Sequence, residues 1–429
     1  MTMEKHGGLT GGVTDKQYVL GRKHHTSEAA LNIGRYYALD GSLGSNVYVD
    51  ALRPHITLIC GKRGYGKSYT IGVLLEEMAQ LDQKAKDNLG VLVLDTLGIF
   101  WTTLFPNKEE KQELKQWNIQ PKGFDIQVLV PKQYVKEYQH QEIPVTAFSM
   151  STAELSPFHW CQLFNVRSTE PLGIAITRAV LTLQNTQKPY SIADIRKEIN
   201  QDTRNDHQVI GAAENFFLMA ESWHLFDIQG VPITEVVKRG TVTTLDMSHL
   251  PDPMLKIIIS SLLGEKIFYE RIRERKRQEQ RKMGMTVTEQ GVPMVWLMID
   301  EAQVFLPNDE DLVSKSVFIH EWMRQGRQPG LSLVMATQRP SALDQEVLSH
   351  SDIIICHRLT AQEDIDALSR IRPTYMHGDI KESVKKVGDE KGVALIVDDT
   401  SESSHVIKVR PRLSWHGGAE SVVIEPKQK

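Results

Sequence analysis

One short stretch constrains this chain more than any other: residues 61–68 read Gly-Lys-Arg-Gly-Tyr-Gly-Lys-Ser. They match the phosphate-loop pattern G-x-x-x-x-G-K-[ST] at every fixed position. The apolar run at 56–60 predicts a strand before the loop, and apolar residues recurring through 71–78 predict a helix after it. A strand, a glycine-rich loop and a helix in this order form the usual setting for binding a nucleotide phosphate.

The residue types of the loop match this chemistry. Glycines let the backbone turn tightly, so that its N–H groups point at phosphate oxygens. Lys67 would neutralise the β- and γ-phosphates, and the Ser68 hydroxyl would be one ligand of Mg²⁺. We therefore expect ATP and Mg²⁺ as cofactors. The residues expected to contact the nucleotide are Gly61, Arg63, Gly64, Tyr65, Gly66, Lys67, Ser68 and Tyr69.

The overall composition is that of an ordinary globular protein. The chain has 429 residues, of which 41% are hydrophobic and 24% charged, enough for two or three domains or one large α/β domain with insertions. Its net charge of −4 gives no global basic field, so any DNA contact has to come from a local basic surface. Cys60, Cys161 and Cys356 show no CxxC spacing, which favours buried thiols over a disulfide framework or zinc site. Without a signal peptide or an apolar run long enough for a bilayer, we expect a cytoplasmic protein.

The texture of the sequence changes along the chain. Residues 1–14 are polar and glycine-rich, which predicts disorder, and 15–52 read as a short β-rich module. Residues 53–429 are expected to form the nucleotide-binding domain, interrupted at about 153–228 by a helical insertion. The aromatic residues Phe216, Phe217 and Trp223 are expected to form the core of the insertion more readily than a base-stacking platform. A long helix is expected at 253–283, and its basic second half is either a DNA or partner contact or a solvated helix end.

Acidic residues follow two other predicted strands. Residues 295–299 are apolar and lead directly into Asp300 and Glu301, which makes them the Walker B partner of the phosphate loop. Asp300 would hold Mg²⁺, and Glu301 would polarise the attacking water, as in hydrolysing P-loop ATPases of the RecA-like division. Asp95 ends the strand predicted at 91–95. It either assists the metal or caps the next turn.

Two further features belong to the same predicted sheet edge. Gln338 follows the strand predicted at 331–337, where its amide can hydrogen-bond the γ-phosphate or the lytic water. A helix predicted at 312–328 carries Arg324 and Arg327. In a ring, either arginine can reach the γ-phosphate of a neighbouring subunit and stabilise the transition state. The alternative is an ordinary surface arginine paired with Glu321 or Asp309.

The assembled motifs resemble the HerA family of the HerA/FtsK translocases. The match rests on residues 61–68, on Met298-Ile-Asp-Glu-Ala302, and on the segment from Glu321 to Ser341 that contains Arg324-Gln-Gly-Arg327 and Ala336-Thr-Gln. It continues through Arg358-Leu-Thr360 and the closing Val409-Arg-Pro-Arg-Leu-x-Trp-His-Gly-Gly418. The resemblance implies a RecA-like P-loop core, a mostly parallel sheet with helices on both faces.

The resemblance also implies a function. Members are homohexameric rings that thread DNA through a central pore, commonly with a nuclease partner, and some bacterial members pair with an effector in phage defence. It assigns phosphate and Mg²⁺ to Lys67 and Ser68, Mg²⁺ to Asp300, water activation to Glu301, and sensing to Gln338. An arginine from the pair Arg324 and Arg327 would act across the subunit boundary.

Two departures from the family pattern stand out. The N-terminal barrel with which members dock partners is shortened, and residues 96–100 read Thr-Leu-Gly-Ile-Phe where a His-Gly-Glu-Tyr-like run is usual. We therefore expect an ATP-driven DNA translocase or helicase. The alternative is a regulatory ATPase scaffold that assembles and controls a partner enzyme without processive movement.

Overall fold

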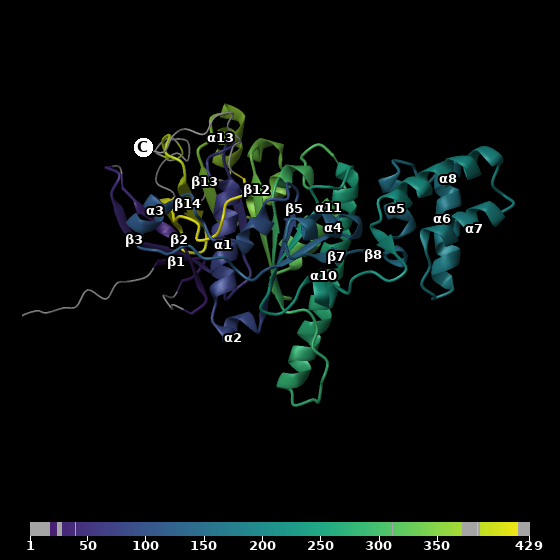
Figure 1. The fold of residues 1–429 in the computed structure, drawn as a ribbon, viewed down its shortest axis with the longest axis horizontal. Coiled ribbons are helices and arrows are strands. Elements are labelled where there is room, and N and C mark those ends of the chain that lie inside the picture. The colour runs from purple at the N-terminus through teal and green to yellow at the C-terminus, as the bar shows by residue number, and fades with distance from the viewer. Residues whose placement is uncertain are drawn as a thin grey trace, which may run out of the picture.

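The computed structural model describes residues 18–23, 28–38, 40–310, 312–370, 384 and 387–418. The disorder expected at 1–14 lies outside these residues. Figure 1 shows an α/β fold built on one large twisted sheet. From edge to edge its strands are β1 (Tyr18–Leu20), β3 (Leu43–Asp50), β2 (Ala30–Tyr37), β15 (Ser403–Val409), β14 (Val393–Asp398), β13 (Ile353–His357), β4 (Ile56–Cys60), β12 (Leu331–Thr337), β11 (Met294–Ile299), β5 (Leu89–Asp95), β10 (Val242–Asp246), β6 (Gln127–Pro131) and β7 (Thr146–Phe148).

The fold class expected from the sequence is confirmed. Every neighbouring pair from β13 to β7 is parallel, whereas β13, β14, β15, β2 and β3 pair antiparallel in turn. The central strands are buried along their whole length, as parallel strands covered on both faces have to be. In β5 the side chains alternate between two cores: Leu92 and Leu94 enter one, and Val91 and Val93 the other.

Helices cover both faces of the sheet. Helix α1 (Lys67–Gln80) packs its apolar side chains into the core on one face, and α10 (Pro253–Lys282) packs into the core on the other. The remaining α-helices are α2 (Gln83–Lys86), α3 (Lys111–Gln116), α4 (Val135–His140), α5 (Pro157–Leu163), α6 (Pro171–Asn185), α7 (Ile192–Gln201), α8 (His207–Ser222), α9 (Ile233–Val236), α11 (Val313–Lys315), α12 (Gln345–His350) and α13 (Gln362–Ser369). The described residues also form single turns and a π-helix: η1 (Phe100–Leu104), η2 (Lys132–Tyr134), η3 (Thr152–Glu154), η4 (Ala302–Val304), the π-helix η5 (Ser316–Met323) and η6 (Pro340–Ala342).

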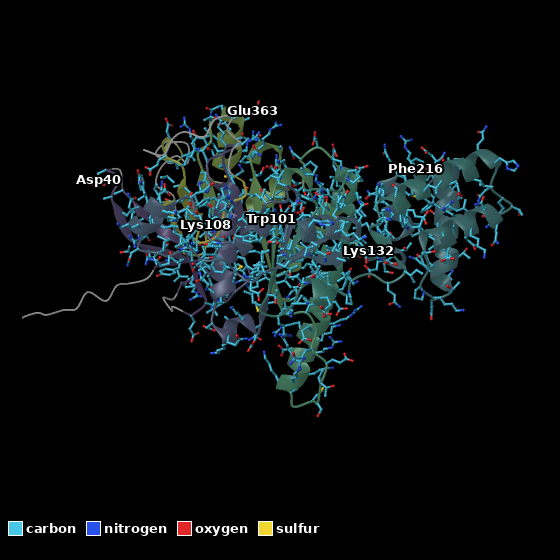
Figure 2. All side chains as sticks on the ribbon, viewed as in Figure 1. Asp40, Trp101, Lys108, Lys132, Phe216 and Glu363 are labelled. Atoms are coloured by element: carbon cyan, nitrogen blue, oxygen red, sulfur yellow. The ribbon has the colours of Figure 1, made fainter. Side chains whose placement is uncertain are left out.

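Helices α5 to α8 form a unit that projects from the sheet, at the right of Figure 1. A two-stranded sheet, β8 (Met150–Ser151) and β9 (Phe226–Asp227), lies at its base. Its aromatic side chains pack on one another: the Trp160 and Phe217 rings are 5.2 Å apart, and Phe164 stacks on Phe216 at 4.9 Å. Figure 2 labels Phe216 within this unit. The expectation that these aromatics form the unit's own core is confirmed.

Several basic side chains in the second half of α10 are engaged by nearby groups. Arg275 pairs with Glu279 at 2.7 Å, and Arg281 pairs with Glu274 at 3.0 Å. Arg271 is buried, and its guanidinium donates to the carbonyls of Val292 and Pro329. These contacts favour the solvated helix end over a DNA contact. None of the helices in the described part of the chain is both long and apolar enough to cross a membrane.

The N-terminal strands continue the main sheet through β15. A buried charge cluster fixes them there, because Asp50 contacts the guanidinium of Arg22 at 2.6 Å and the imidazole of His55 at 3.3 Å. Burial alone would lower the pKa of His55, but its hydrogen bonds to Asp352 and Asp50 outweigh burial and raise the pKa to about 9. The division of the chain at residue 52 stays a prediction.

The C-terminal segment holds α1 in place through hydrogen bonds and ion pairs. Glu76 is fully buried in α1 and accepts hydrogen bonds from the guanidinium of Arg410 at 2.8 Å and from the backbone N–H of Ser414 at 2.9 Å. Arg412 is also buried and donates to the hydroxyls of Thr103 and Ser414. Charges removed from water in this way need such partners. The closing motif therefore holds the helix that follows the phosphate loop.

Candidate nucleotide-binding site

The phosphate loop lies between β4 and α1, at the carboxyl edge of the sheet. The backbone N–H of Gly61 donates to the carbonyl of Thr337 at the end of β12, and that of Lys62 donates to the carbonyl of Arg358 just after β13. These two bonds tie the loop to both strands that flank β4. Ligands of open α/β sheets bind at this edge, so the loop sits where a nucleotide is expected.

A buried histidine supports the loop from beneath. His357 lies at the end of β13; its Nδ1 donates to the carbonyl of Val393 at 3.1 Å, and its Nε2 is 2.9 Å from the hydroxyl of Thr70 in α1. Burial lowers the pKa of His357 to about 4, so the imidazole is neutral at physiological pH. A Cβ on Gly66 would lie 3.0 Å from the His357 ring, at a backbone φ of 122°. Glycine is therefore required at this turn.

We expect Gly66→Ala to weaken ATP binding by roughly 10- to 100-fold, because a strain of ~1–3 kcal/mol falls on the loop. Calorimetry with a non-hydrolysable ATP analogue measures the effect. Gly211→Ala is the matched control, since a Cβ at this position in α8 meets no atom within 4 Å. Binding of the analogue to Gly66→Ala with unchanged affinity would contradict the role of the loop.

The two halves of the expected site meet in the structure. The Ser68 hydroxyl donates to Oδ2 of Asp300 at 3.1 Å, and Asp300 is fully buried at the end of β11. Burial lowers the pKa of Lys67, an effect partly offset by the nearby carboxylates of Glu301 and Asp300. Burial, together with repulsion from Glu301, raises the pKa of Asp300 to about 6. A cation would relieve this cost, and the two hard oxygen donors fit Mg²⁺.

Glu301 is held in an unusual conformation. Its φ is 54°, in the left-handed region that non-glycine residues seldom adopt, and such strain is frequent at functional sites. Its Oε1 accepts a hydrogen bond from the Gln338 amide at 2.5 Å, and its Oε2 accepts one from the Gln303 amide at 2.6 Å. The structure thus brings Lys67, Ser68, Asp300, Glu301 and Gln338 together.

Asp95 lies on the neighbouring strand, in register with Asp246 on β10. Its Oδ1 accepts the backbone N–H of Gly98 and its Oδ2 accepts that of Phe100, both at 2.8 Å. Burial, with Asp246 beside it, raises the pKa of Asp95 to about 8. Of the two roles considered for Asp95, these hydrogen bonds correspond to capping the turn that follows the strand. Its role as a metal ligand stays a prediction that these contacts do not favour.

The remaining loop residues differ in what they face. The side chain of Tyr69 turns away from the loop: its hydroxyl donates to Glu110 at 2.6 Å and accepts the backbone N–H of Arg412 at 2.7 Å. Tyr69 can therefore serve a nucleotide only through its backbone. Arg63 and Gly64 are exposed, and the guanidinium of Arg358 lies 5.4 Å over the Tyr65 ring.

The two arginines lie at the end of the π-helix η5: Arg324 is its C-cap, and Arg327 lies in the turn that follows. The helix expected at 312–328 is present as α11 and η5, and a turn that begins at Gly326 ends it. Arg324 forms a bidentate pair with Glu346 of α12, at 2.7 Å and 3.0 Å. This is the surface pairing considered as the alternative for Arg324, with Glu346 as its partner in place of Glu321 or Asp309. Arg327 is exposed, and no hydrogen bond or ion pair of its side chain is found within the described chain.

Three side chains at the site were not assigned a role from the sequence. His357 supports the phosphate loop, and Arg358 lies over Tyr65. Both residues face the loop because β13 lies beside β4. Gln303 contacts Glu301 from two residues away. An amide so close to a Walker B acid was the one signal available for it.

Comparison with known proteins places this chain in a family. The family model described as "Helicase HerA, central domain" matches residues 31–266, more than half of the chain. A protein of Sulfurisphaera tokodaii, named DNA double-strand break repair helicase HerA, is 21% identical over 94% of this chain and 74% of its own length. A relative of the same name from Saccharolobus solfataricus is 22% identical over 73% of this chain and 58% of its own.

A solved structure shares the fold. VirB4 of Thermoanaerobacter pseudethanolicus superposes with a TM-score of 0.55 at 13% identity, covering 90% of this chain and 97% of its own. At this identity the likeness concerns the fold alone, a P-loop α/β core. Taken together with the family match, these findings show that the chain belongs to the family of HerA helicases and carries its ATPase core.

Proposed function

We propose that this chain is the subunit of a ring that hydrolyses ATP and uses the energy to move along DNA. The observation that supports this most is the hydrogen bond between Ser68 and Asp300, which joins segments more than two hundred residues apart at one nucleotide pocket. The relatives named as DNA repair helicases support DNA as the substrate.

Each side chain of the pocket has one proposed task. Lys67 binds the β- and γ-phosphates, and Ser68 and Asp300 hold Mg²⁺, which neutralises phosphate charge when it is bound. Glu301 accepts a proton from the attacking water. Gln338, already hydrogen-bonded to Glu301, senses whether the γ-phosphate is present. In a hexameric ring, Arg327 of a neighbouring subunit supplies a cation for the charge that develops on the γ-phosphate in the transition state.

The contact with DNA is proposed to depend on phosphate charge and to be independent of base sequence. The ring acts in the cytoplasm, together with a nuclease or another effector protein, in DNA end processing or in defence against phages. The projecting α5–α8 unit offers one surface for such a partner, since Ile174 and Leu181 of α6 expose large apolar side chains there. Because exposed apolar side chains can mark a surface for another protein, a regulatory scaffold is the second candidate function.

Displacement of a third strand from a DNA triplex separates the two candidates. A translocase shows ATP turnover stimulated by double-stranded DNA and displaces the third strand only while ATP is hydrolysed. The Glu301→Gln variant, which should bind ATP without hydrolysing it, is the negative control. Turnover that ignores DNA, with no displacement, would overturn translocation. If that turnover still switched a co-expressed nuclease, it would establish the scaffold.

A further inference from the structure

We propose that Gln303 is a positioning residue for ATP hydrolysis: its amide holds the carboxylate of Glu301 in the orientation that activates water. The inference rests on the proposed role of Glu301 as the base. The Gln303 Nε2 donates to Oε2 of Glu301 at 2.6 Å, which is a charge-assisted hydrogen bond. Gln303 lies in the short turn η4, directly after the Walker B strand.

A second hydrogen bond sets the direction of this amide. The hydroxyl of Thr337, fully buried at the end of β12, donates to Oε1 of Gln303 at 2.7 Å. Since the amide oxygen is thereby engaged, the NH₂ group has to face Glu301. The chain Thr337–Gln303–Glu301 therefore links the tip of the strand beside the phosphate loop to the proposed base.

The need for Gln303 follows from the other donor to Glu301. Gln338 donates to Oε1 of Glu301 at 2.5 Å, yet it is also the proposed sensor of the γ-phosphate. When ATP is bound and Gln338 turns towards the phosphate, Gln303 is left as the donor that fixes the carboxylate. Glu301 needs such support because its backbone is in the left-handed region, at φ 54°.

A purely structural role fits the contacts less well. The turn η4 is closed by backbone hydrogen bonds from Val304 to Glu301 and from Phe305 to Ala302, neither of which uses the Gln303 side chain. Gln303 is also half-buried, so a side chain of similar length can replace it without opening a cavity. Its removal should therefore affect the orientation of Glu301 more than the fold.

The test compares Gln303→Met, which keeps the length of the side chain but cannot donate, with Gln201→Met, an exposed glutamine at the end of α7. We expect Gln303→Met to lower kcat by roughly 10- to 100-fold, because a misplaced catalytic group costs about this much. The KM for ATP, the affinity for an ATP analogue and the Tm should stay unchanged. Thr337→Val should lower kcat in the same way, while Thr337→Ser, which keeps the hydroxyl, should restore it.

A double variant shows whether Gln303 acts through Glu301. In the Glu301→Gln background, adding Gln303→Met should leave the residual single-turnover rate unchanged, since the group it orients is already gone. An unchanged kcat for Gln303→Met, or an equal loss in both backgrounds, would overturn the proposal for Gln303 alone. If Glu301→Gln itself keeps full turnover, the assigned role of Glu301 is wrong, which is a different failure.

Discussion

Replacing Glu301 by glutamine is expected to leave ATP bound and to stop its hydrolysis. The substitution keeps the size of the side chain but removes the group that accepts the proton of the attacking water. General-base catalysis contributes roughly 10²- to 10⁴-fold, so kcat should fall by about that factor. Lys67, Ser68 and Asp300, which bind the phosphates and the cation, are untouched. Phosphate release measures turnover, and analogue binding measures affinity.

Glu363→Gln is the matched control for this variant, because it removes the same charge from a residue that is exposed on α13 (Figure 2). It should behave as the unaltered protein in both assays. A Glu301→Gln variant that loses nucleotide affinity together with turnover would contradict the assignment. Glu301 would then contribute to binding, and another group would activate the water.

Arg327→Ala is expected to lower turnover by roughly 10³-fold or more, the loss typical of an arginine that stabilises the transition state from a neighbouring subunit. Arg327 is preferred over Arg324 because its guanidinium is exposed and has no partner among the side chains described here. Arg324 is already held by Glu346 at 2.7 Å. Both alanine variants are compared by steady-state ATP hydrolysis at saturating ATP and DNA. The turnover of Arg324→Ala should fall much less than that of Arg327→Ala.

Mixing two inactive variants tests whether the arginine acts in trans. A subunit carrying Arg327→Ala has an intact Glu301, and a subunit carrying Glu301→Gln has an intact Arg327. Mixed rings therefore contain some complete pockets, and partial hydrolysis should return. If no mixture restores turnover while Arg324→Ala is inactive alone, Arg324 is the trans arginine instead.

The central strands and the pocket followed from the sequence because local patterns encode them. Three apolar runs of five to seven residues predict buried parallel strands, and they lead into the phosphate loop, Asp300 and Gln338. Parallel strands bring their carboxyl ends to one edge of the sheet. The meeting of Ser68 with Asp300 is a consequence of that arrangement. The helical character of the projecting unit was also readable, because its helices carry N-caps such as Ser191. Its bounds as a separate insertion at about 153–228 stay a prediction.

What the sequence left undecided depends on contacts between distant segments. Asp95 ends a strand as Asp300 does, and only its hydrogen bonds to Gly98 and Phe100 reveal a cap. The pairing of Arg324 with Glu346 depends on how α12 packs beside η5. Tyr69 is in the first turn of α1, yet its side chain is taken by the C-terminal segment. No local sequence pattern indicates which distant residue each of these side chains contacts.

Turnover per subunit, followed as the protein is diluted while mass photometry records its assembly state, tests the central claim most directly. If each pocket is completed by Arg327 of an adjacent subunit, hydrolysis per subunit should collapse as rings dissociate, while Lys67 and its loop still bind the nucleotide. Single subunits that hydrolyse ATP at the full rate would contradict the account.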